Sequence, residues 1–591
     1  MFLQNYNPLG NAFLSTLVAA LPLITLLYLL AVHPWRDQGG NPRRGIEAPK
    51  AAAIASLLAF AVAIFVLRMP ATAAVASFVY GSATGLFPIG WILLSAMFLY
   101  TLTVVTGQFD VVKESITRVS SDRRIQVLII AFSLGAFLEG AAGFGIPVAI
   151  AGALMVGLGF SPFQAAVLNL LANPVPVAFG GIGTPIITLG KVTGLDDNVL
   201  AALTGKELAL FCLIIPTWVI AVMVKMDGKP WQKVWEVWPA LLTAGLSFTL
   251  TQLFVSAYMG PSLVGILSGL VSMAALVVLS LVWRPAAPYE EAPEPEPLII
   301  NGRKMIPMAG GSAAVLTGDF AREAPRYTTG QVFHAWMPWI LLTVLVFVWG
   351  QPSIKPALLQ PIFGLPTLVK IPIPFLHHVV VRMPPVATGT RTGESALFTF
   401  DWLSTPGTGL FLAAVLSGIW LRATGAQWRE AASRTLTRMQ RPLITVGTVL
   451  GFSYLTRYAG TDGILGLAFT RTGWLYPFFA PLLGWLGVFI TGSDTSANAM
   501  FGSLQQITAR QLGLNEVLIT TANTSGGVMA KMIGAQSLVI ATAATYEKEE
   551  EGKAAVGQIF RAMVGHSLVL SLMMGIVIML MAYVFTGLLP K

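Results

Sequence analysis

The sequence predicts an all-α polytopic membrane protein with an inverted repeat, about twelve transmembrane helices and two re-entrant helical hairpins. Three observations predict this class. The 591 residues are 55% hydrophobic and 11% charged, and the mean hydropathy is +0.73, values far from those of soluble domains. Apolar runs long enough to cross about 30 Å of hydrocarbon recur along the chain. Two further apolar runs are each broken by an acidic residue among small residues.

The apolar runs define the expected spans and the division of the chain. We expect spanning helices at 13–32, 50–67, 89–107, 164–190, 206–226, 236–256, 261–283, 331–350, 407–421, 441–459, 515–546 and 556–588. The four expected parts are an N-terminal helix with the first cytoplasmic loop (1–45), a first repeat (46–230), linking helices (231–403) and a second repeat (404–591). A Pro- and Glu-rich cytoplasmic loop at 284–330 and an outside loop at 351–406 flank the span at 331–350.

The first broken run, 125–160, predicts a hairpin that enters the membrane and turns back. Its arms of 14 and 16 residues would rise only about 21 and 24 Å as helices, too little to cross the bilayer comfortably. Its expected tip is the non-helical segment 139–143, from which Gly140 and Gly143 are candidate substrate-binding residues. Lipid cannot satisfy the polar groups of such backbone, so the tip should line a protein cavity. A second hairpin is expected at 474–512.

Three short sequence matches in the same order indicate a duplication, and the basic residues give its orientation. GAFLEG at 135–140 matches GVFITG at 487–492, LLAN at 170–173 matches TTAN at 520–523, and FLYTLTVVTGQFD at 98–110 aligns loosely with FSYLTRYAGTD at 452–462. Basic residues gather in the segments 33–50, 108–125, 225–233 and 422–441, which predicts that these face the cytoplasm and that both termini lie outside. The equivalent segments 68–88 and 422–441 carry one and five basic residues. We therefore expect inverted repeats, the architecture of secondary transporters.

Composition excludes several other classes. The net charge of +9 resides in a few loops, as membrane topology requires, and does not indicate a nucleic-acid partner. The single cysteine, Cys212, excludes an internal disulfide and a cysteine metal site. The sequence has no Walker A loop, HExxH or GxSxG motif, which argues against ATP-driven pumping and common hydrolases. We expect no cofactor or metal; the expected partners are the bilayer and a small solute, and the oligomeric state stays open.

Two acids lie at the expected hairpin tips, Glu139 in the first and Asp494 in the second. Carboxylates inside a membrane are costly, and ion or proton pathways are their usual role. We therefore expect Glu139 and Asp494 to carry the coupling proton. The alternative is that each caps the helix that follows.

The second tip is rich in short polar side chains, namely Thr491, Ser493, Thr495, Ser496 and Asn498. Together they can replace the hydration shell of a polar solute, and helix starts offer free N–H groups to an anion. We expect Thr491, Ser493 and Asn498 to bind substrate. The alternative is that the cluster only forms the turn and caps the helix.

Two interrupted spans carry the remaining candidates. Prolines beside Asn173 and the Gly526–Gly527 pair beyond Asn523 should loosen both helices, so that unwound backbone near each asparagine faces a ligand. Lys531 needs an anionic partner inside the membrane.

That partner is the substrate carboxylate or one of the two acids, unless Lys531 extends to a membrane boundary. Gln536 and Thr184 are weaker candidates for substrate binding.

Four blocks, GAFLEGAAGFGIPVAIAGALMVGLGF, ANPVPVAFGGIGTPI, TGSDTSANAMFG and ANTSGGVMAKMIGAQS, resemble the signature blocks of the L-lactate permease family. The candidate residues within matched positions are Glu139, Asn173, Asp494, Asn523 and Lys531. Members of that family are proton-coupled symporters of lactate and often glycolate, in a superfamily of inverted repeats with re-entrant hairpins. The family usually has Thr at the place of Pro174 and Ser-Pro at the place of Gly534-Ala535, departures that bear on substrate range.

The resemblance implies a secondary active transporter in the cell membrane that imports L-lactate and related 2-hydroxymonocarboxylates such as glycolate together with protons. A sodium-coupled carboxylate transporter of the same superfamily is the alternative, because Ser, Thr and Asn oxygens also suit Na⁺. A channel and a membrane-embedded enzyme are further alternatives, although no nucleophile with a positioned base is evident in the sequence.

Overall fold

Helices dominate the computed structural model and confirm the helical membrane class. The structure describes every residue except 32, 37–41, 45, 118–119, 121, 144, 287–288, 290–297, 301–302, 306–326, 352–353, 363, 388–392, 547 and 591. Among the described residues, ten helices are long and apolar enough to cross a membrane, or eleven if the bent pair within 516–545 is one span. The predicted loop 284–330 lies largely outside the described residues, and the four-part division of the chain stays a prediction.

The N-terminal elements are a series of helices with three short strands, of which the second and third pair with each other. They are β1 (Phe2–Leu3), α1 (Ala12–Ala31), β2 (Pro34–Arg36), β3 (Pro42–Arg44), α2 (Ala48–Ala61), η1 (Val62–Val66), α3 (Ala71–Thr84), η2 (Gly85–Gly90), α4 (Trp91–Val105) and α5 (Gln108–Thr117). The predicted connection 68–88 is therefore mostly helical. Small residues explain this, because a Cβ on Gly81 would lie 2.2 Å from the Leu450 carbonyl oxygen, so α3 packs directly on a later helix.

Two packed helical arms occupy the first predicted hairpin, and the turn between them lies slightly later than expected. Re-entry of these arms into the membrane stays a prediction. The elements are α6 (Arg123–Val127), η3 (Leu128–Leu134), α7 (Gly135–Ala141) and α8 (Ile146–Gly157), and α8 packs back against η3. Glu139 and Gly140 remain helical, which corrects the expected non-helical tip at 139–143. The chain turns at 142–145 instead, where Gly143 and Gly145 have φ of +63° and +79°, angles that favour glycine.

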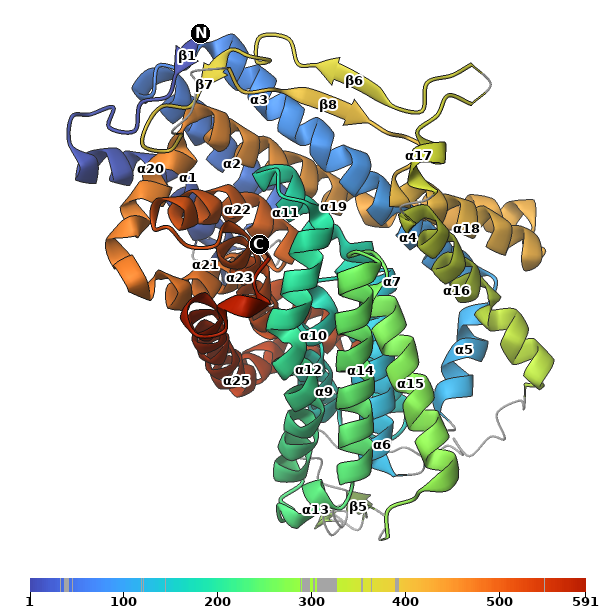
Figure 1. Cartoon of the computed structure of the whole chain (residues 1–591). Helices are drawn as coiled ribbons and strands as arrows, with labels where there is room; N and C mark the ends of the chain where they lie inside the picture. The colour runs from blue at the N-terminus through green and yellow to red at the C-terminus, as the bar shows by residue number, and fades with distance from the viewer. Residues whose placement is uncertain are drawn as a thin grey trace.

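Seven helices follow between residues 162 and 282. They are α9 (Pro162–Ala172), α10 (Pro174–Val177), α11 (Gly180–Thr193), α12 (Asp197–Met226), α13 (Gln232–Trp235), α14 (Trp238–Tyr258) and α15 (Val264–Val282). The predicted span 164–190 is thus three short helices, interrupted at the prolines and glycines. Helices α12, α14 and α15 stand side by side, and α15 also packs on α7 (Figure 1).

The middle of the chain contains one long helix and most of the β-structure. The elements are β4 (Leu298–Ile300), β5 (Arg303–Met305), α16 (Thr329–Gly350), α17 (Lys355–Leu358), β6 (Val369–Pro372), β7 (Val380–Val381) and β8 (Leu397–Phe400). Each strand pairs with one other: β2 with β3, β4 with β5 and β6 with β8 antiparallel, and β1 with β7 parallel. The predicted outside loop 351–406 therefore holds the N-terminal strand at one end of the molecule (Figure 1).

The C-terminal elements are α18 (Pro406–Trp420), α19 (Gly425–Ala459), α20 (Thr461–Phe469), η4 (Thr470–Leu475), α21 (Tyr476–Thr491), α22 (Asp494–Gln511), α23 (Glu516–Ala530), η5 (Lys531–Ile533), α24 (Ala535–Thr545), α25 (Glu549–Tyr583) and η6 (Thr586–Leu588). The basic segment 422–441 is helical from Gly425, because α19 extends well before the predicted span. The segments 68–88 and 422–441, whose basic residues indicate the orientation of the repeats, are thus mainly helical. The inverted orientation of the repeats stays a prediction.

The second predicted hairpin, 474–512, contains helices α21 and α22, and its re-entry into the membrane stays a prediction. Helices α21 and α22 pack against each other and are joined by Gly492 and Ser493 alone. Gly492 has φ of +71° and ends α21, and the Ser493 hydroxyl accepts a hydrogen bond from the Ser496 amide at 3.2 Å to begin α22. Entry of the two hairpins from opposite sides of the bilayer stays a prediction.

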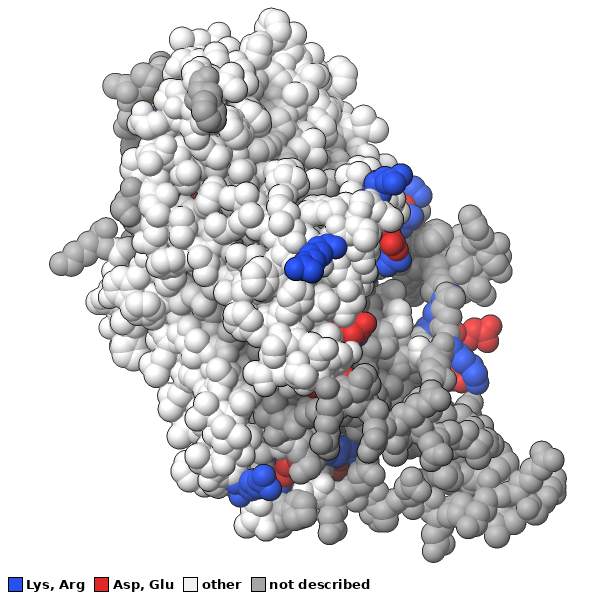
Figure 2. All heavy atoms as spheres, turned by 90° about the vertical axis from the view of Figure 1, so that its right-hand side faces the viewer, with Lys and Arg blue, Asp and Glu red and all other residues white. Residues whose placement is uncertain are grey.

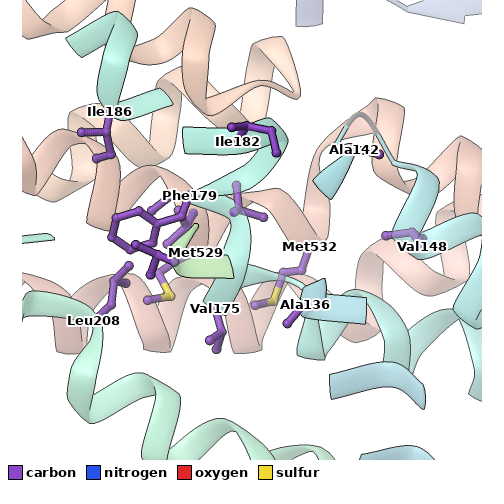
Figure 3. Packing of buried hydrophobic residues seen from close by; sticks show 14 of the residues in the cluster. Ala136, Ala142, Val148, Val175, Phe179, Ile182, Ile186, Leu208, Met529 and Met532 are labelled. Carbon is purple, nitrogen blue, oxygen red and sulfur yellow. The ribbon is translucent and has the colours of Figure 1, made fainter. Parts of the chain in front are cut away.

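The core between the two halves is apolar. Phe179, Met529 and Leu208, from the α10–α11 junction, α23 and α12, point toward one another in Figure 3. Many large hydrophobic side chains are exposed on the outer surface, and Figure 2 shows one face on which Lys, Arg, Asp and Glu are few among the described residues. Because a soluble protein rarely exposes so much continuous apolar surface, this distribution agrees with a bilayer environment.

Candidate functional site

One cavity of about 340 Å³ lies where the two hairpin turns meet α11 and η5. Its volume falls in the range of small-molecule pockets. Eight of the predicted site residues line it: Glu139, Gly143, Thr184, Thr491, Ser493, Asp494, Lys531 and Gln536. The sequence thus located both the turns and the charged groups that surround the cavity.

Asp494 occupies the first turn of α22 with its side chain 2% exposed. Neither carboxylate oxygen has a hydrogen-bond partner among the described residues. The helix cap is Ser493, so the expected alternative of a capping aspartate does not apply to Asp494. A Cβ on Gly527 would approach Asp494 Oδ1 to 2.5 Å, which shows that α23 packs closely on this carboxylate. Asp494 is therefore a buried acid with unused acceptor capacity.

Glu139 is equally buried, at 3% exposed, but it is held by a neighbour. Asn173, at the junction of α9 and α10, donates from Nδ2 to Glu139 Oε2 at 3.2 Å. Asn173 itself does not line the cavity, and its Oδ1 has no partner among the described residues. A Cβ on Gly180 would lie 2.9 Å from Glu139 Oε1, so this glycine leaves the space that the carboxylate occupies. The first acid is thus positioned by α9–α11.

Lys531 begins η5 and is buried within the protein, at 7% exposed. Its Nζ donates to the Gly492 carbonyl oxygen at 2.7 Å, so it ties the break after α23 to the turn of the second hairpin. Lys531 also attracts both Glu139 and Asp494 electrostatically. Within the described part of the chain, no ion pair closer than 4 Å joins it to either acid. An ammonium has three donors, and this one retains two for a ligand.

The helix break lies at Lys531 and not near Asn523, which corrects the expected unwinding around that asparagine. Helix α23 is continuous through Asn523 and the glycine pair. The glycines serve close packing: a Cβ on Gly526 would lie 2.0 Å from the Pro481 carbonyl oxygen. Loss of a side chain here brings helices together and does not loosen them.

Asn498 and Asn523 are engaged with each other behind the cavity wall. Asn523 Nδ2 donates to Asn498 Oδ1 at 2.9 Å, and Asn498 Nδ2 donates to Thr524 Oγ1 at 2.6 Å and to the Pro185 carbonyl oxygen at 3.1 Å. Neither asparagine lines the cavity. Their amides join α11, α22 and α23.

The hydroxyls of the second turn are also largely used within the protein. Thr491 Oγ1 donates to the Gly487 carbonyl oxygen at 2.7 Å and accepts from the Ser493 amide at 3.1 Å. Gln536 packs its Cβ near Gly492 and is exposed to the cavity. These contacts shape the turn that presents Asp494.

The two candidate glycines of the first hairpin, Gly140 and Gly143, lie in different surroundings. A Cβ on Gly140 would lie 2.5 Å from the Ile266 amide nitrogen, so Gly140 packs on α15 and not in the cavity. Gly143 lines the cavity beside Gly181. Thr184 lines it from the first turns of α11.

Two features of the site were not identified from the sequence. Residues 181–183 form a left-handed turn in which even Ile182 has φ of +60°, a strained value for a β-branched residue. The sequence GGIG at 180–183 is the feature that indicates such a turn, because glycine readily adopts positive φ. The far wall of the cavity includes Glu47 and Arg441, whose side chains pair at 3.4 Å.

Comparison with known proteins agrees with the resemblance seen in the motifs. The family model for L-lactate permease matches residues 15–585. The chain is 42% identical to the glycolate permease GlcA of Escherichia coli K12 over 590 residues, and 41% identical to the L-lactate permease of Salmonella typhimurium over 588 residues, with 99% of each chain covered in both cases. The solved YdaH transporter of Alcanivorax borkumensis overlaps with a TM-score of 0.43 at 13% identity, covering 98% of this chain and 99% of that one. On the first two findings, the chain belongs to the L-lactate permease family of membrane transporters.

Proposed function

We propose that this protein imports L-lactate and related small 2-hydroxymonocarboxylates, such as glycolate, together with protons across the cell membrane. The observation that carries the proposal is the cavity in which the Lys531 ammonium and the unpartnered Asp494 carboxylate lie between two helix turns. The printed names of the relatives, glycolate permease and L-lactate permease, support this substrate class.

The substrate carboxylate binds at Lys531 in this proposal. One of the three ammonium donors is used by the Gly492 carbonyl oxygen, and two remain for an anion. The bond to Gly492 also holds the ammonium in place, so that little side-chain entropy is lost when the ligand arrives. The free N–H groups at the start of α22 add a favourable dipole for negative charge.

Charge balance explains why a proton accompanies the substrate. With Lys531 protonated and both acids ionised, the empty site has a net charge of about −1 from these three side chains. A bound monocarboxylate makes this net charge more negative. Two unit charges about 4 Å apart interact by about 4 kcal/mol at an effective dielectric constant of about 20, so the added negative charge is costly. Substrate binding therefore favours protonation of one acid, and protonation favours substrate binding, because linkage is reciprocal.

Asp494 is the better carrier of the transported proton. Its oxygens have no donors among the described residues, whereas Glu139 accepts a hydrogen bond from Asn173 that favours its ionised form. Once protonated, Asp494 can donate its own hydrogen bond to the substrate. In this proposal Asn498 and Asn523 hold the helices that carry the site, and Thr491, Ser493, Gly143, Thr184 and Gln536 shape the cavity wall around the ligand.

The predicted topology gives the direction in which this cavity faces. Glu47 and Arg441, at the far wall, belong to segments that the basic residues place in the cytoplasm. At the other end of α19, Arg457 donates to the Val192 carbonyl oxygen at 2.7 Å and Tyr454 to the Lys191 carbonyl oxygen at 3.2 Å. Helices α11 and α19 are thus joined at one end and separated by the cavity at the other. We infer an inward-facing state, with both termini outside.

Uptake of labelled L-lactate into proteoliposomes tests the proposal. We expect an inward pH gradient to drive accumulation, an uncoupler to abolish it, and unlabelled glycolate to compete. Asp494→Asn should retain exchange of internal for external lactate while it loses accumulation driven by pH. Uptake that requires Na⁺ and is indifferent to pH would contradict the proton coupling and favour the sodium-coupled alternative, for which the Asp494 oxygens would be ligands.

A further inference from the structure

Beyond the cavity, helix α12 contains a buried acid that the transport cycle described above does not use. Glu207 lies ten residues after the start of α12, about 15 Å along a helix of 30 residues. Its side chain is 0% exposed. A carboxylate so placed is costly in a membrane protein unless it has a function or a fixed partner.

The partner of Glu207 is a hydroxyl group on α23. Thr521 Oγ1 lies 2.5 Å from Glu207 Oε1, and Ser525, on the same helix, donates to the Thr521 carbonyl oxygen. Oε2 is buried and has no partner among the described residues. The same Thr521 hydroxyl lies 2.8 Å from the Val517 carbonyl oxygen. The Leu518 carbonyl oxygen lies 3.1 Å away, so one hydroxyl hydrogen is within reach of three acceptors.

This arrangement accommodates both protonation states of Glu207. When Glu207 is ionised, Thr521 donates its hydrogen to Oε1. When Glu207 is protonated, the acid can donate to Thr521 Oγ1, and the hydroxyl turns its hydrogen to the Val517 carbonyl oxygen, since a hydroxyl donates one hydrogen bond and accepts others. The change needs one bond rotation.

The surroundings contribute no charge that would fix one state. The adjacent Leu208 points to Phe179 and Met529 (Figure 3), and α9, α10 and α14 contain no Asp, Glu, Lys, Arg or His. The charged or titratable groups on the packed elements, and on α12 itself, are Lys191 on α11, Asp197, Lys206, Cys212 and Lys225 on α12, Lys233 on α13, Tyr258 on α14, Arg123 and Arg124 on α6, Glu516 at the start of α23 and Lys531 just after its end, and Glu549, Glu550, Glu551, Lys553, Arg561, His566 and Tyr583 on α25. Lys206 donates to the Leu588 carbonyl oxygen, and His566 accepts from Trp218.

Helix α23 connects Glu207 to the cavity. Thr521 contacts Glu207, and Gly527 on the same helix packs on Asp494, where a Cβ would lie 2.5 Å from Oδ1. Any shift of α23 that accompanies a change at one acid alters the packing of the other. The helix then continues to Lys531, which binds the hairpin turn.

We propose that Glu207 is a second proton-binding site, which exchanges its proton through the Thr521 hydroxyl as substrate binds and leaves. This inference rests on the proposed function for its place in transport. Its ligand is a proton, since Thr521 and Ser525 offer too few oxygens beside the carboxylate to enclose a hydrated cation such as Na⁺.

Infrared difference spectra of the purified full-length protein test the site without measuring transport. We expect wild type to show a carboxylic-acid C=O band that titrates with pH and responds to added L-lactate. The Glu207 part of this absorption should be lost in Glu207→Gln, which preserves size and neutrality, while the Asp494 part remains. Both parts should be present in Glu550→Gln, the control that removes an exposed carboxyl group on α25. Thr521→Val removes the donor that favours the ionised form and should raise the midpoint of the band by about 1–2 pH units.

Three outcomes would overturn the inference: a spectrum unchanged in Glu207→Gln, a Glu207 band that is constant at every pH and lactate concentration, or a band that responds to Na⁺ but not to pH. The transport assay separates this inference from the proposed function. If wild-type uptake does not depend on the pH gradient, the proposed proton coupling is refuted, even when the Glu207 band titrates. If uptake follows the pH gradient and the band does not titrate, only the second site fails.

Discussion

Removal of the Lys531 ammonium is the most informative perturbation of the site. Lysine 531 is 7% exposed and donates at 2.7 Å to the Gly492 carbonyl oxygen. A hydrogen bond to a charged group contributes about 1.5–3 kcal/mol. Since each 1.4 kcal/mol changes affinity tenfold, Lys531→Ala should weaken L-lactate binding by about 10- to 150-fold. Lys531→Arg keeps the charge but not the geometry, and should retain part of the affinity.

Calorimetric titration of the purified protein with L-lactate measures this loss. Lys206→Ala is the matched control, because Lys206 is an exposed lysine that donates to a backbone carbonyl oxygen on another surface. The control should bind as wild type does. If Lys531→Ala binds L-lactate within twofold of wild type while its thermal stability is unchanged, the carboxylate is held elsewhere and the assignment of Lys531 is refuted.

Two further predictions concern the packing that supports the site. Gly484→Ala should destabilise the protein by about 1–3 kcal/mol or more, because the new Cβ would lie 1.8 Å from the Asn523 carbonyl oxygen; Gly557→Ala, with open space around it, should instead stabilise α25 by about 1 kcal/mol. Thermal melting in detergent checks both, and equal melting points would contradict the close packing. Asn498→Ala should lower the melting point by leaving Asn523 and Thr524 without their partner, and an unchanged melting point would show that the amide has no structural role.

The second hairpin turn could be predicted because its signals are local. An apolar run that stops at Gly492 and is followed by Ser493 leaves few alternatives, since glycine ends one helix and serine caps the next. The charged groups were predictable for the same reason that they are rare: an acid or ammonium inside an apolar run stands out. Hence Glu139, Asp494 and Lys531 could be assigned to one cavity before the structure was known.

What the sequence did not reveal depends on contacts between distant segments. A glycine in a membrane helix loosens it or admits a neighbouring backbone, and only the position of the Pro481 carbonyl oxygen shows that Gly526 does the second. The polar partners of Asn498 and Asn523 are equally distant in sequence, at Pro185 and Thr524. Helix α3 was missed because its small residues carry little hydropathy signal of their own.

Glu207 was overlooked because the predicted span 206–226 begins at the neighbouring lysine, which places the pair at a membrane boundary. The structure instead begins α12 at Asp197, so that Glu207 lies well inside the helix and against α23. The predicted start of the span at 206 therefore places Glu207 near the membrane surface, whereas the observed start of α12 at Asp197 places it in the buried part of the helix.

The most direct test of the substrate cavity is protection of a single cysteine. Cys212 is the chain's one cysteine, so Cys212→Ala gives a background without thiols. In that background Gln536→Cys lies on the cavity wall, and Lys206→Cys lies on a separate surface. We predict that L-lactate slows thiol labelling at 536 and leaves labelling at 206 unchanged. Equal labelling rates at 536 with and without saturating L-lactate would contradict a substrate site between the two hairpin turns.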